Sequence, residues 1–407
     1  MKPCQKFTRQ AMVDELQLIT DWWQSHSIDL KNGGFVGEVN SAGVPQHLAS
    51  KGIILNSRIL WFFSELAVFS GLQTEQGKSA LATATRSYEY LMAHFDDKQY
   101  GGAVWELNHL GECVDSKKQT YAQCFCIYAF CAYYQATGKQ QVLDKAMGYF
   151  SLVEQYTRDQ KMGGYIEAFQ HNWLPIEDFR LSEKDMNTPK SMNTHLHVLE
   201  AFSALYKVNP CAEVEESLRH VLLMFKQHII DLENGHLRLF FSEDWRDQSS
   251  SYSYGHDIEA SWLIWEAVEI LADPELLKEW RPLVIHMAQV CAKESLGVHG
   301  QVCEDYDKIK QHKAQEGYWW VQAEALVGLL NLFHLTGDKH LNDICENIWL
   351  FIQRYHKDPV AGEWFWLANV DDANCHQSYK AGFWKAPYHN GRAMMEVIKL
   401  FDKLQQP

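Results

Sequence analysis

Six glycine-containing turns recur along the chain at a nearly constant spacing. In each turn the glycine is flanked by aromatic or β-branched residues, and the six glycines are Gly34, Gly102, Gly164, Gly235, Gly300 and Gly362. Successive turns are separated by 62 to 71 residues, which leaves room for two helices and a loop. An acidic residue usually stands a few positions before the turn, as turn chemistry favours, at Asp29, Asp97, Asp159, Asp231 and Asp358. The chain is therefore expected to consist of six similar structural units.

The segments between the turns have the apolar spacing of helices. Residues 53–62 and 260–268 are examples, because their apolar side chains recur at intervals of three and four positions. Short breakers such as Ser70-Gly71 and Asn209-Pro210 divide the intervals into two helices each. With a first helix near residues 9–25 and a last one near 389–404, the sequence predicts twelve helices in six pairs. Six sequential pairs can close into a double-layered ring, so we predict an all-α (α/α)6 barrel with short β-hairpins or loops at one end.

Two other architectures fit the same periodicity, namely an open helical solenoid and two unrelated helical domains. The closed ring is favoured because it removes the exposed apolar ends of an open stack. The 407 residues, 46% of them hydrophobic, are enough for one large core. No linker rich in Pro, Gly or Ser divides the chain, so we expect residues 1–407 to form a single domain.

Charge and composition restrict the partners and the compartment. The formal net charge is −15, with acidic and basic residues interspersed, so the surface should repel nucleic acid and anionic membranes. The N-terminus lacks the apolar region of a signal peptide, and no stretch approaches the 18 apolar residues needed to cross a bilayer. The ten cysteines form no CxxC pair and often lie in apolar helical runs, which is typical of reduced core residues. We expect a cytoplasmic protein with no nucleic-acid or membrane partner.

Unusual polar and aromatic residues gather near the starts of the helices that follow the glycine turns. They are Arg58, Tyr121, Asn193, His197, His256, Glu259, Trp319, Glu324, His389 and Arg392. Equivalent positions in successive repeats of a ring point to one end, so these side chains should converge on one pocket. Nearby helix N-termini would favour developing negative charge there. His256 and Glu259 are three residues apart and share a helix face, so Glu259 can orient His256, a natural proton shuttle at neutral pH.

Other interpretations of these residues are open. A buried histidine is often structural, and His195 is assigned to that class because its two-residue offset from His197 turns it to another face. Neither HExxH nor CxxC occurs, so no metal site is predicted. Paired carboxylates, Glu259 with Asp185 or Glu324, would suit a glycoside hydrolase. A non-catalytic binding barrel is a third class. Phosphate loops, nucleophile elbows and dinucleotide fingerprints are absent from the sequence.

Five segments resemble one enzyme family. They are KGIILNSRILWFFSE, KSMNTHLHVLEAF, GHDIEASWLIWEA, YWWVQAEALVG and WKAPYHNGRAMMEV. Together they resemble the N-acylglucosamine 2-epimerase superfamily, and within it the cellobiose 2-epimerases and the mannose-acting isomerases and epimerases, over residues 30 to 400. The resemblance implies an (α/α)6 barrel, a small sugar as substrate and no metal or redox cofactor.

The resemblance also implies roles for individual residues. His256 and His389 would be the two acid/base residues on opposite sides of the substrate's C2, with Glu259 supporting His256. The implied substrate-binding residues are Arg58 and His197 near C1 and C2, Tyr121 and Asn193 as further hydrogen-bonding groups, the acid Asp185, and Trp319 and Trp384 as surfaces that stack on the sugar.

The implied chemistry is proton transfer at C1–C2 of a ring-opened aldose. Removing the C2 proton gives a cis-enediolate; returning it to the other face of C2 gives the epimer, whereas delivering it to C1 gives the ketose. Gly317-Tyr318 and Ala386 depart from the more polar entry and the cysteine expected in the cellobiose enzymes, which argues against a disaccharide. We therefore expect a mannose isomerase that interconverts D-mannose and D-fructose, as a monomer or homodimer. The alternatives are a 2-epimerase of mannose or glucose, or of cellobiose-type β-1,4 disaccharides, and more distantly a glycoside hydrolase.

Overall fold

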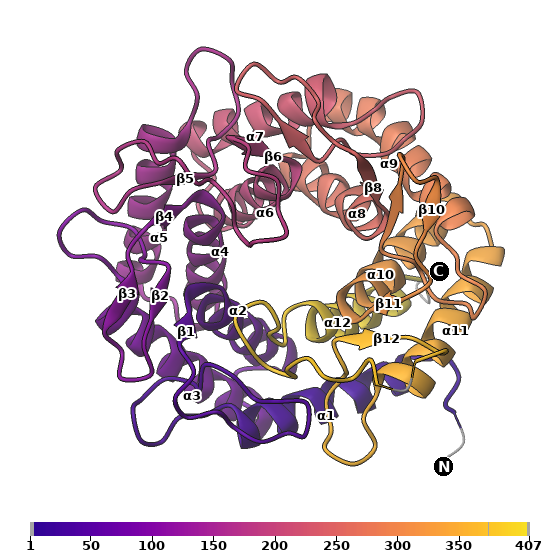
Figure 1. Cartoon of the computed structure of the whole chain (residues 1–407), viewed down its shortest axis with the longest axis horizontal. Helices are drawn as coiled ribbons and strands as arrows, with labels where there is room; N and C mark the ends of the chain where they lie inside the picture. Colours follow the sequence, from indigo (N-terminus) through magenta and orange to yellow (C-terminus); the bar gives the residue numbers. More distant parts are fainter. Residues whose placement is uncertain (1–3, 373, 405–407) are drawn as a thin grey trace.

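The computed structural model describes residues 4–372 and 374–404, which contain twelve α-helices in two concentric layers (Figure 1). The inner layer consists of α2 (Ile53–Ser70), α4 (Thr120–Thr137), α6 (Met192–Val208), α8 (Tyr254–Leu271), α10 (Trp319–Thr336) and α12 (His389–Leu404). The outer layer consists of α1 (Arg9–His26), α3 (Glu75–Tyr90), α5 (Gln140–Leu152), α7 (Ala212–Met224), α9 (Pro274–Glu294) and α11 (His340–Phe351). The predicted (α/α)6 barrel is confirmed.

The chain runs once around the ring and closes on itself (Figure 1). Inner helices that follow one another in the sequence are neighbours in space, and α12 also contacts α2. The first outer helix, α1, packs against α12, so the two ends of the chain together make the sixth helix pair. This closure rules out the open solenoid.

The two layers differ in sequence because they differ in surroundings. Helix α2 is buried from Ile53 to Ser64 without interruption, whereas α3 buries Gly77, Ala80 and Ala84 at intervals of three and four positions. Helix α2 is long and apolar enough to cross a membrane, with a mean hydropathy of 1.4, contrary to our sequence analysis. Because 78% of that segment is buried within the protein, its apolarity is explained by its place in the inner wall.

Short antiparallel strands lie at the end of the barrel where the inner helices begin (Figure 1). Two sheets have three strands: β1 (Lys51–Gly52), β2 (Glu106–Leu107) and β3 (Cys113–Asp115), and β8 (Ser251–Ser253), β9 (Asp305–Asp307) and β10 (His312–Lys313). Three sheets have two strands: β4 (Lys118–Gln119) with β5 (Ala168–Phe169), β6 (Lys190–Ser191) with β7 (Phe240–Phe241), and β11 (Gly317–Tyr318) with β12 (Leu367–Ala368). Strands β1, β4, β6, β8 and β11 each lead directly into an inner helix. Each pairs with a strand of the next repeat, so the sheets connect neighbouring units at this end.

Four outer helices end in a five-residue π-helical turn before the chain enters the glycine turn. These turns are η1 (Leu91–Phe95) after α3, η2 (Val153–Thr157) after α5, η3 (Phe225–Ile229) after α7 and η4 (Ile352–His356) after α11. The recurrence of this ending shows that the repeat extends to backbone detail.

The acidic residues before the glycine turns do more than form the turns. In four repeats the carboxylate also binds a buried lysine that lies shortly before the next inner helix, at N–O distances of 2.5 to 3.0 Å. The pairs are Asp29 with Lys51, Asp97 with Lys118, Asp159 with Lys190 and Asp358 with Lys380. At Lys51, Lys118 and Lys190, burial lowers the pKa of the ammonium group and outweighs the carboxylate's opposite effect. These ion pairs fix each turn to the start of a helix that carries site residues.

The turn glycines make a testable prediction about this end of the barrel. Gly164 has a φ of 75°, and a Cβ there would lie 2.4 Å from the ring of Trp245 and 2.6 Å from Nε2 of His195. Gly138 has a φ of 64° but has open space around its Cβ position. Gly138→Ala should therefore cost only the left-handed backbone strain of about 1–2 kcal/mol. Gly164→Ala should cost about 1–3 kcal/mol more, because the neighbouring rings must move.

Thermal unfolding of the two variants and the wild type measures this difference. We expect the lower Tm for Gly164→Ala. Equal decreases in Tm would show that the close approach of the turn to the inner helix does not contribute to stability.

Candidate active site

Arg392, on α12, binds three carboxylates that come from three other inner helices. It is 1% exposed. Its Nη2 donates to Glu259 on α8 and to Glu324 on α10, each at 2.7 Å, and its Nη1 donates to Glu200 on α6. The guanidinium has the fork geometry for several carboxylates at once, and these carboxylates raise its pKa further. Four inner helices are thus joined by one buried cation.

Glu324 also binds His389, the first residue of α12. The distance from Glu324 Oε1 to His389 Nδ1 is 2.6 Å, and Trp262 donates its indole N–H to the other oxygen at 3.2 Å. Burial lowers the pKa of His389 well below its ordinary value. A neutral His389 that donates from Nδ1 to Glu324 keeps the lone pair of Nε2, which can accept a proton from a substrate.

A buried ion pair anchors the segment on either side of His389. Glu363, in the last glycine turn, accepts hydrogen bonds from Lys385 and Asn390, each at 2.7 Å. Lys385 follows Trp384 directly, and Asn390 follows His389 directly. Glu363 therefore holds both Trp384 and the start of α12 in place.

Three residues are spaced closely enough to hold a metal ion, namely Glu259, Glu324 and His389. One potential ligand atom from each lies within 4.8 Å of the others. Arg392 Nη2 is already bound to both carboxylates, and Nδ1 of His389 is directed at Glu324. The donor atoms are thus used in hydrogen bonds with one another, and Arg392 supplies the positive charge. That the reaction needs no metal stays a prediction.

His256, on the first turn of α8, has a different environment. Its Nδ1 lies 2.6 Å from the hydroxyl of Ser253, which also caps the helix by accepting from the backbone N–H of His256. Burial lowers the pKa of His256 to about 3. The ring is therefore neutral at physiological pH, and Ser253 fixes its orientation.

The expected support of His256 by Glu259 is wrong. The two residues share α8 and are three positions apart, but the carboxylate of Glu259 binds Arg392 and lies 4.0 Å from Nδ1 of His389. Helical spacing predicted that the two side chains start near each other. The strongest nearby charge, Arg392, determines where the carboxylate points.

Trp320 lies next to both histidines. Its ring centroid is 4.8 Å from that of His256 and 5.7 Å from that of His389. Trp319, which we expected to stack on the sugar, is instead 3% exposed and packs against Trp366 at 4.2 Å. Trp319 and Trp320 are adjacent in the sequence. The half-buried Trp320, and not Trp319, is placed to contact a ligand.

A third cluster joins most of the other expected substrate-binding residues. Arg58 donates to the hydroxyl of Tyr121 at 2.8 Å and to the backbone oxygen of Trp384 at 3.0 Å. The ring of Tyr121 is 4.8 Å from that of His197, whose Nδ1 is 2.9 Å from Glu200. Arg58, Tyr121, His197 and Trp384 are therefore brought together, as expected.

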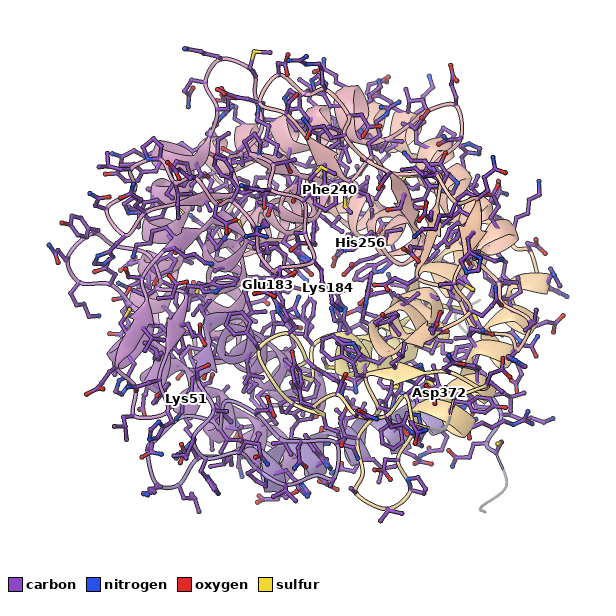
Figure 2. The ribbon with its side chains drawn as sticks, viewed as in Figure 1. Lys51, Glu183, Lys184, Phe240, His256 and Asp372 are labelled. Atoms are coloured by element: carbon purple, nitrogen blue, oxygen red, sulfur yellow. The ribbon has the colours of Figure 1, made fainter. Side chains whose placement is uncertain are left out.

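Asp185 and Asn193 line a cavity of about 280 Å³ at the hairpin end, together with His256. Six residues of the loop 179–186 line it, and Figure 2 shows Glu183 and Lys184 of this loop lying over the central opening of the barrel. One oxygen of Asp185 accepts hydrogen bonds from the backbone and the hydroxyl of Ser182, each at 2.8 Å. The loop thus sets the position of this carboxylate in the cavity that His256 also lines.

The carboxylates considered above for a hydrolase, Glu259, Glu324 and Asp185, have different surroundings. Glu259 and Glu324 both bind Nη2 of Arg392 and are fully buried, whereas Asp185 lies on the loop at the cavity. His195, expected to be structural, is 0% exposed and accepts from the backbone N–H of Tyr165 at 2.9 Å.

Sequence analysis missed three residues of the site. They are Glu200, Ser253 and Tyr388, whose hydroxyl donates to Glu200 at 2.6 Å. Glu200 follows His197 by three positions, the same helical spacing that was noted for His256 and Glu259, so that signal was available. Ser253 precedes α8 by one residue, where an N-cap serine is ordinary and gives no hint of a histidine partner.

Curated relatives of the chain include sugar epimerases and a sugar isomerase. A cellobiose 2-epimerase of Bacteroides fragilis is 41% identical over 391 residues, which cover 96% of this chain and 98% of that protein. The structure of the cellobiose 2-epimerase of Bacillus thermoamylovorans B4167 matches with a TM-score of 0.89 and 31% identity, covering 96% of this chain and 98% of that one. The D-mannose isomerase of Marinomonas mediterranea is 21% identical over 90% of this chain and 91% of that protein.

These relatives correct the expectation of a mannose–fructose isomerase, which is wrong. That expectation depended on Ala386 and on Gly317-Tyr318 as residues of an outer sugar pocket. Ala386 is 2% exposed, and Gly317 is buried in the pairing of β11 with β12. None of Gly317, Tyr318 and Ala386 lines the cavity at the hairpin end, so they do not argue against a second sugar ring there.

The family model described as N-acylglucosamine 2-epimerase matches residues 33–393. The match includes all six glycine turns and the four segments that carry Arg58, His197, His256 and His389. The enzyme is accordingly an isomerase or epimerase of carbohydrates. The chain belongs to the N-acylglucosamine 2-epimerase family.

Proposed function

We propose that this enzyme is a 2-epimerase of a free β-1,4-linked disaccharide of the cellobiose type. The observation that carries the proposal is the placement of two histidines, His256 and His389, at the same indole, that of Trp320. The relatives named cellobiose 2-epimerase, at 34 to 41% identity over 94 to 96% of the chain, support the choice of substrate.

The reaction begins with an open-chain aldose, whose C2 proton is acidic because the C1 aldehyde stabilises the resulting enediolate. One imidazole removes this proton with its Nε2 lone pair. The charge that develops on O1 is stabilised by hydrogen bonds from cationic and hydroxyl groups, and Arg58, Tyr121 and His197 form such a cluster. The second histidine enters this step as an imidazolium and protonates C2 from the opposite face, which inverts this carbon and leaves that ring neutral.

The histidines exchange roles between the two directions of the reaction. Because burial lowers the pKa of both rings, a protonated ring is a strong acid toward the carbon of the enediolate. At His389 the carboxylate of Glu324 stabilises the imidazolium that forms when the ring takes the C2 proton. Each turnover leaves one histidine with an added proton and the other without the proton that it delivered.

The non-reacting sugar ring of a disaccharide has a place beside His256. The cavity of about 280 Å³ at the hairpin end offers Asp185, Asn193 and Lys184 for hydroxyl groups and Phe240 for a sugar's C–H face (Figure 2). We place the reducing sugar between the histidines and the second ring in this cavity.

Incubation with cellobiose in D2O, with a chelator present, tests the function. We expect NMR to show a product with the mannose configuration at the reducing end and with deuterium at C2, and undiminished turnover in the chelator. A ketose with deuterium at C1 would instead mean isomerisation. Release of free glucose would mean hydrolysis, and no exchange with any aldose would mean a binding protein. Each of these results contradicts the proposal.

Ser253 tests the role of His256 without removing the ring. Ser253→Ala deletes the hydroxyl that lies 2.6 Å from Nδ1, and one lost hydrogen bond of about 1 kcal/mol corresponds to about a fivefold decrease in kcat. Ser253→Thr retains the hydroxyl and serves as the matched control. We expect kcat to fall in Ser253→Ala with little change in KM, and to recover in Ser253→Thr.

A purely structural role for Ser253 as the cap of α8 would lower the Tm without this split between kcat and KM. Wild-type kcat in Ser253→Ala would show that the hydroxyl does not orient the catalytic ring.

A further inference from the structure

A second cavity lies in the barrel, at the end opposite the hairpins. Its volume is about 50 Å³, and its lining includes Glu65, Gln135, Lys207, Glu266 and Lys399. These residues belong to the later turns of α2, α4, α6, α8 and α12, whose first turns carry the active site. Gln135, Lys207 and Lys399 are exposed, so this cavity reaches solvent at the far end of the ring.

One layer of side chains separates this cavity from the active site. Glu200 lines the cavity and also accepts a hydrogen bond from Nδ1 of His197 at 2.9 Å. Arg392 lines the cavity and binds Glu259 and Glu324, the two carboxylates next to His389. The same residues therefore face the catalytic histidines on one side and the far cavity on the other.

The cavity is suited to water. One water needs about 10–15 Å³ of such space, so about three can be held. Arg392 is 1% exposed, and its Nε–H has no acceptor among the residues that the structure describes. A buried guanidinium N–H of this kind is ordinarily satisfied by water. The carboxylates of Glu65, Glu266 and Glu396 provide further partners for a chain of waters.

We propose that the far cavity is a proton-exchange route, in which Glu200, ordered water and Glu266 connect the active-site histidines with solvent behind the barrel. The inference rests on the proposed epimerisation, because that reaction leaves the two histidines with exchanged protons after every turnover. Through this route the histidines can regain their starting protonation states while a sugar and the 179–186 loop occupy the opening at the hairpin end of the barrel.

Each step of the route moves one proton and no other atom. The loaded catalytic histidine passes its proton, through a sugar hydroxyl or a water, to Nε2 of His197. His197 then releases its Nδ1 proton to the carboxylate of Glu200, which passes it to a cavity water. The water transfers it to Glu266, and Glu266 releases it to bulk solvent. The same steps in reverse load the other histidine.

The charges along the route support this direction of transfer. Burial would raise the pKa of Glu200, but Arg392 and the hydrogen bond from His197 outweigh it and keep the pKa below its ordinary value, so Glu200 does not retain the proton. Burial, together with the charge of Glu396, raises the pKa of Glu266 to about 7. Glu266 can therefore both take up and release a proton at neutral pH.

Glu266→Gln tests the route, because it keeps the size of the side chain and removes the exchangeable carboxyl proton. The histidines return to their starting protonation states after product has formed. The rate of this return therefore contributes to kcat and not to kcat/KM. We expect kcat with cellobiose to fall by about tenfold, with kcat/KM within about twofold of the wild type. The matched control is Glu154→Gln outside the inner ring, where Glu154 accepts from the hydroxyl of Tyr165. The control should leave both parameters unchanged.

A second variant removes the water instead of the carboxyl group. Ser203 lines the cavity and is 5% exposed, so Ser203→Leu fills part of the space. We expect the same selective loss of kcat, with the Tm measured to show that the fold is retained. A decrease of kcat and kcat/KM together, or wild-type kinetics in both variants, would overturn the route.

The assay separates the route from the proposed function. The variants are compared on whichever aldose the wild type labels at C2 in D2O. If the wild-type enzyme labels a different sugar at C2, the proposed substrate is refuted. The proton route can still be tested by comparing the variants on that sugar. Absence of labelling with every aldose would refute both.

Discussion

The site depends on one buried cation and the carboxylates around it. Arg392 binds Glu200, Glu259 and Glu324, which come from three different inner helices, and it is almost completely shielded from solvent. Removing one partner from such a cluster would leave a buried charge without compensation, which is strongly destabilising. The cluster therefore fixes the helices relative to one another, and it sets the position of His389 through Glu324 and of His197 through Glu200.

The ring is what makes such a cluster available. Six inner helices begin at the same end, so their first turns meet although they lie far apart in the sequence (Figure 1). The glycine turns and the Asp–Lys pairs, such as Asp159 with Lys190, hold these helix starts against the neighbouring repeats. Rigid helix starts are suited to proton transfer, because a displacement of one ångström is costly for catalysis.

The sequence was sufficient for the fold and for most residues of the candidate site, since both depend on periodic or local signals. The glycine spacing predicted six units, and family-like segments identified His256, His389 and Arg58. The partners of these residues were harder to predict, because a partner is decided by charge in three dimensions. Glu259 was assigned to His256 from helical spacing, but it binds Arg392. The substrate was misjudged from Ala386, a residue that is buried away from the cavity.

The central claim is that His256 and His389 act on opposite faces of one carbon, and a crystal structure with a bound open-chain disaccharide alditol tests it most directly. An alditol has no aldehyde, so it binds without reacting and marks the position of C2. The account predicts Nε2 of His256 and Nε2 of His389 within about 3.5 Å of C2, one on each face. An alditol that contacts only one of the two rings, or both rings on the same face, would contradict it.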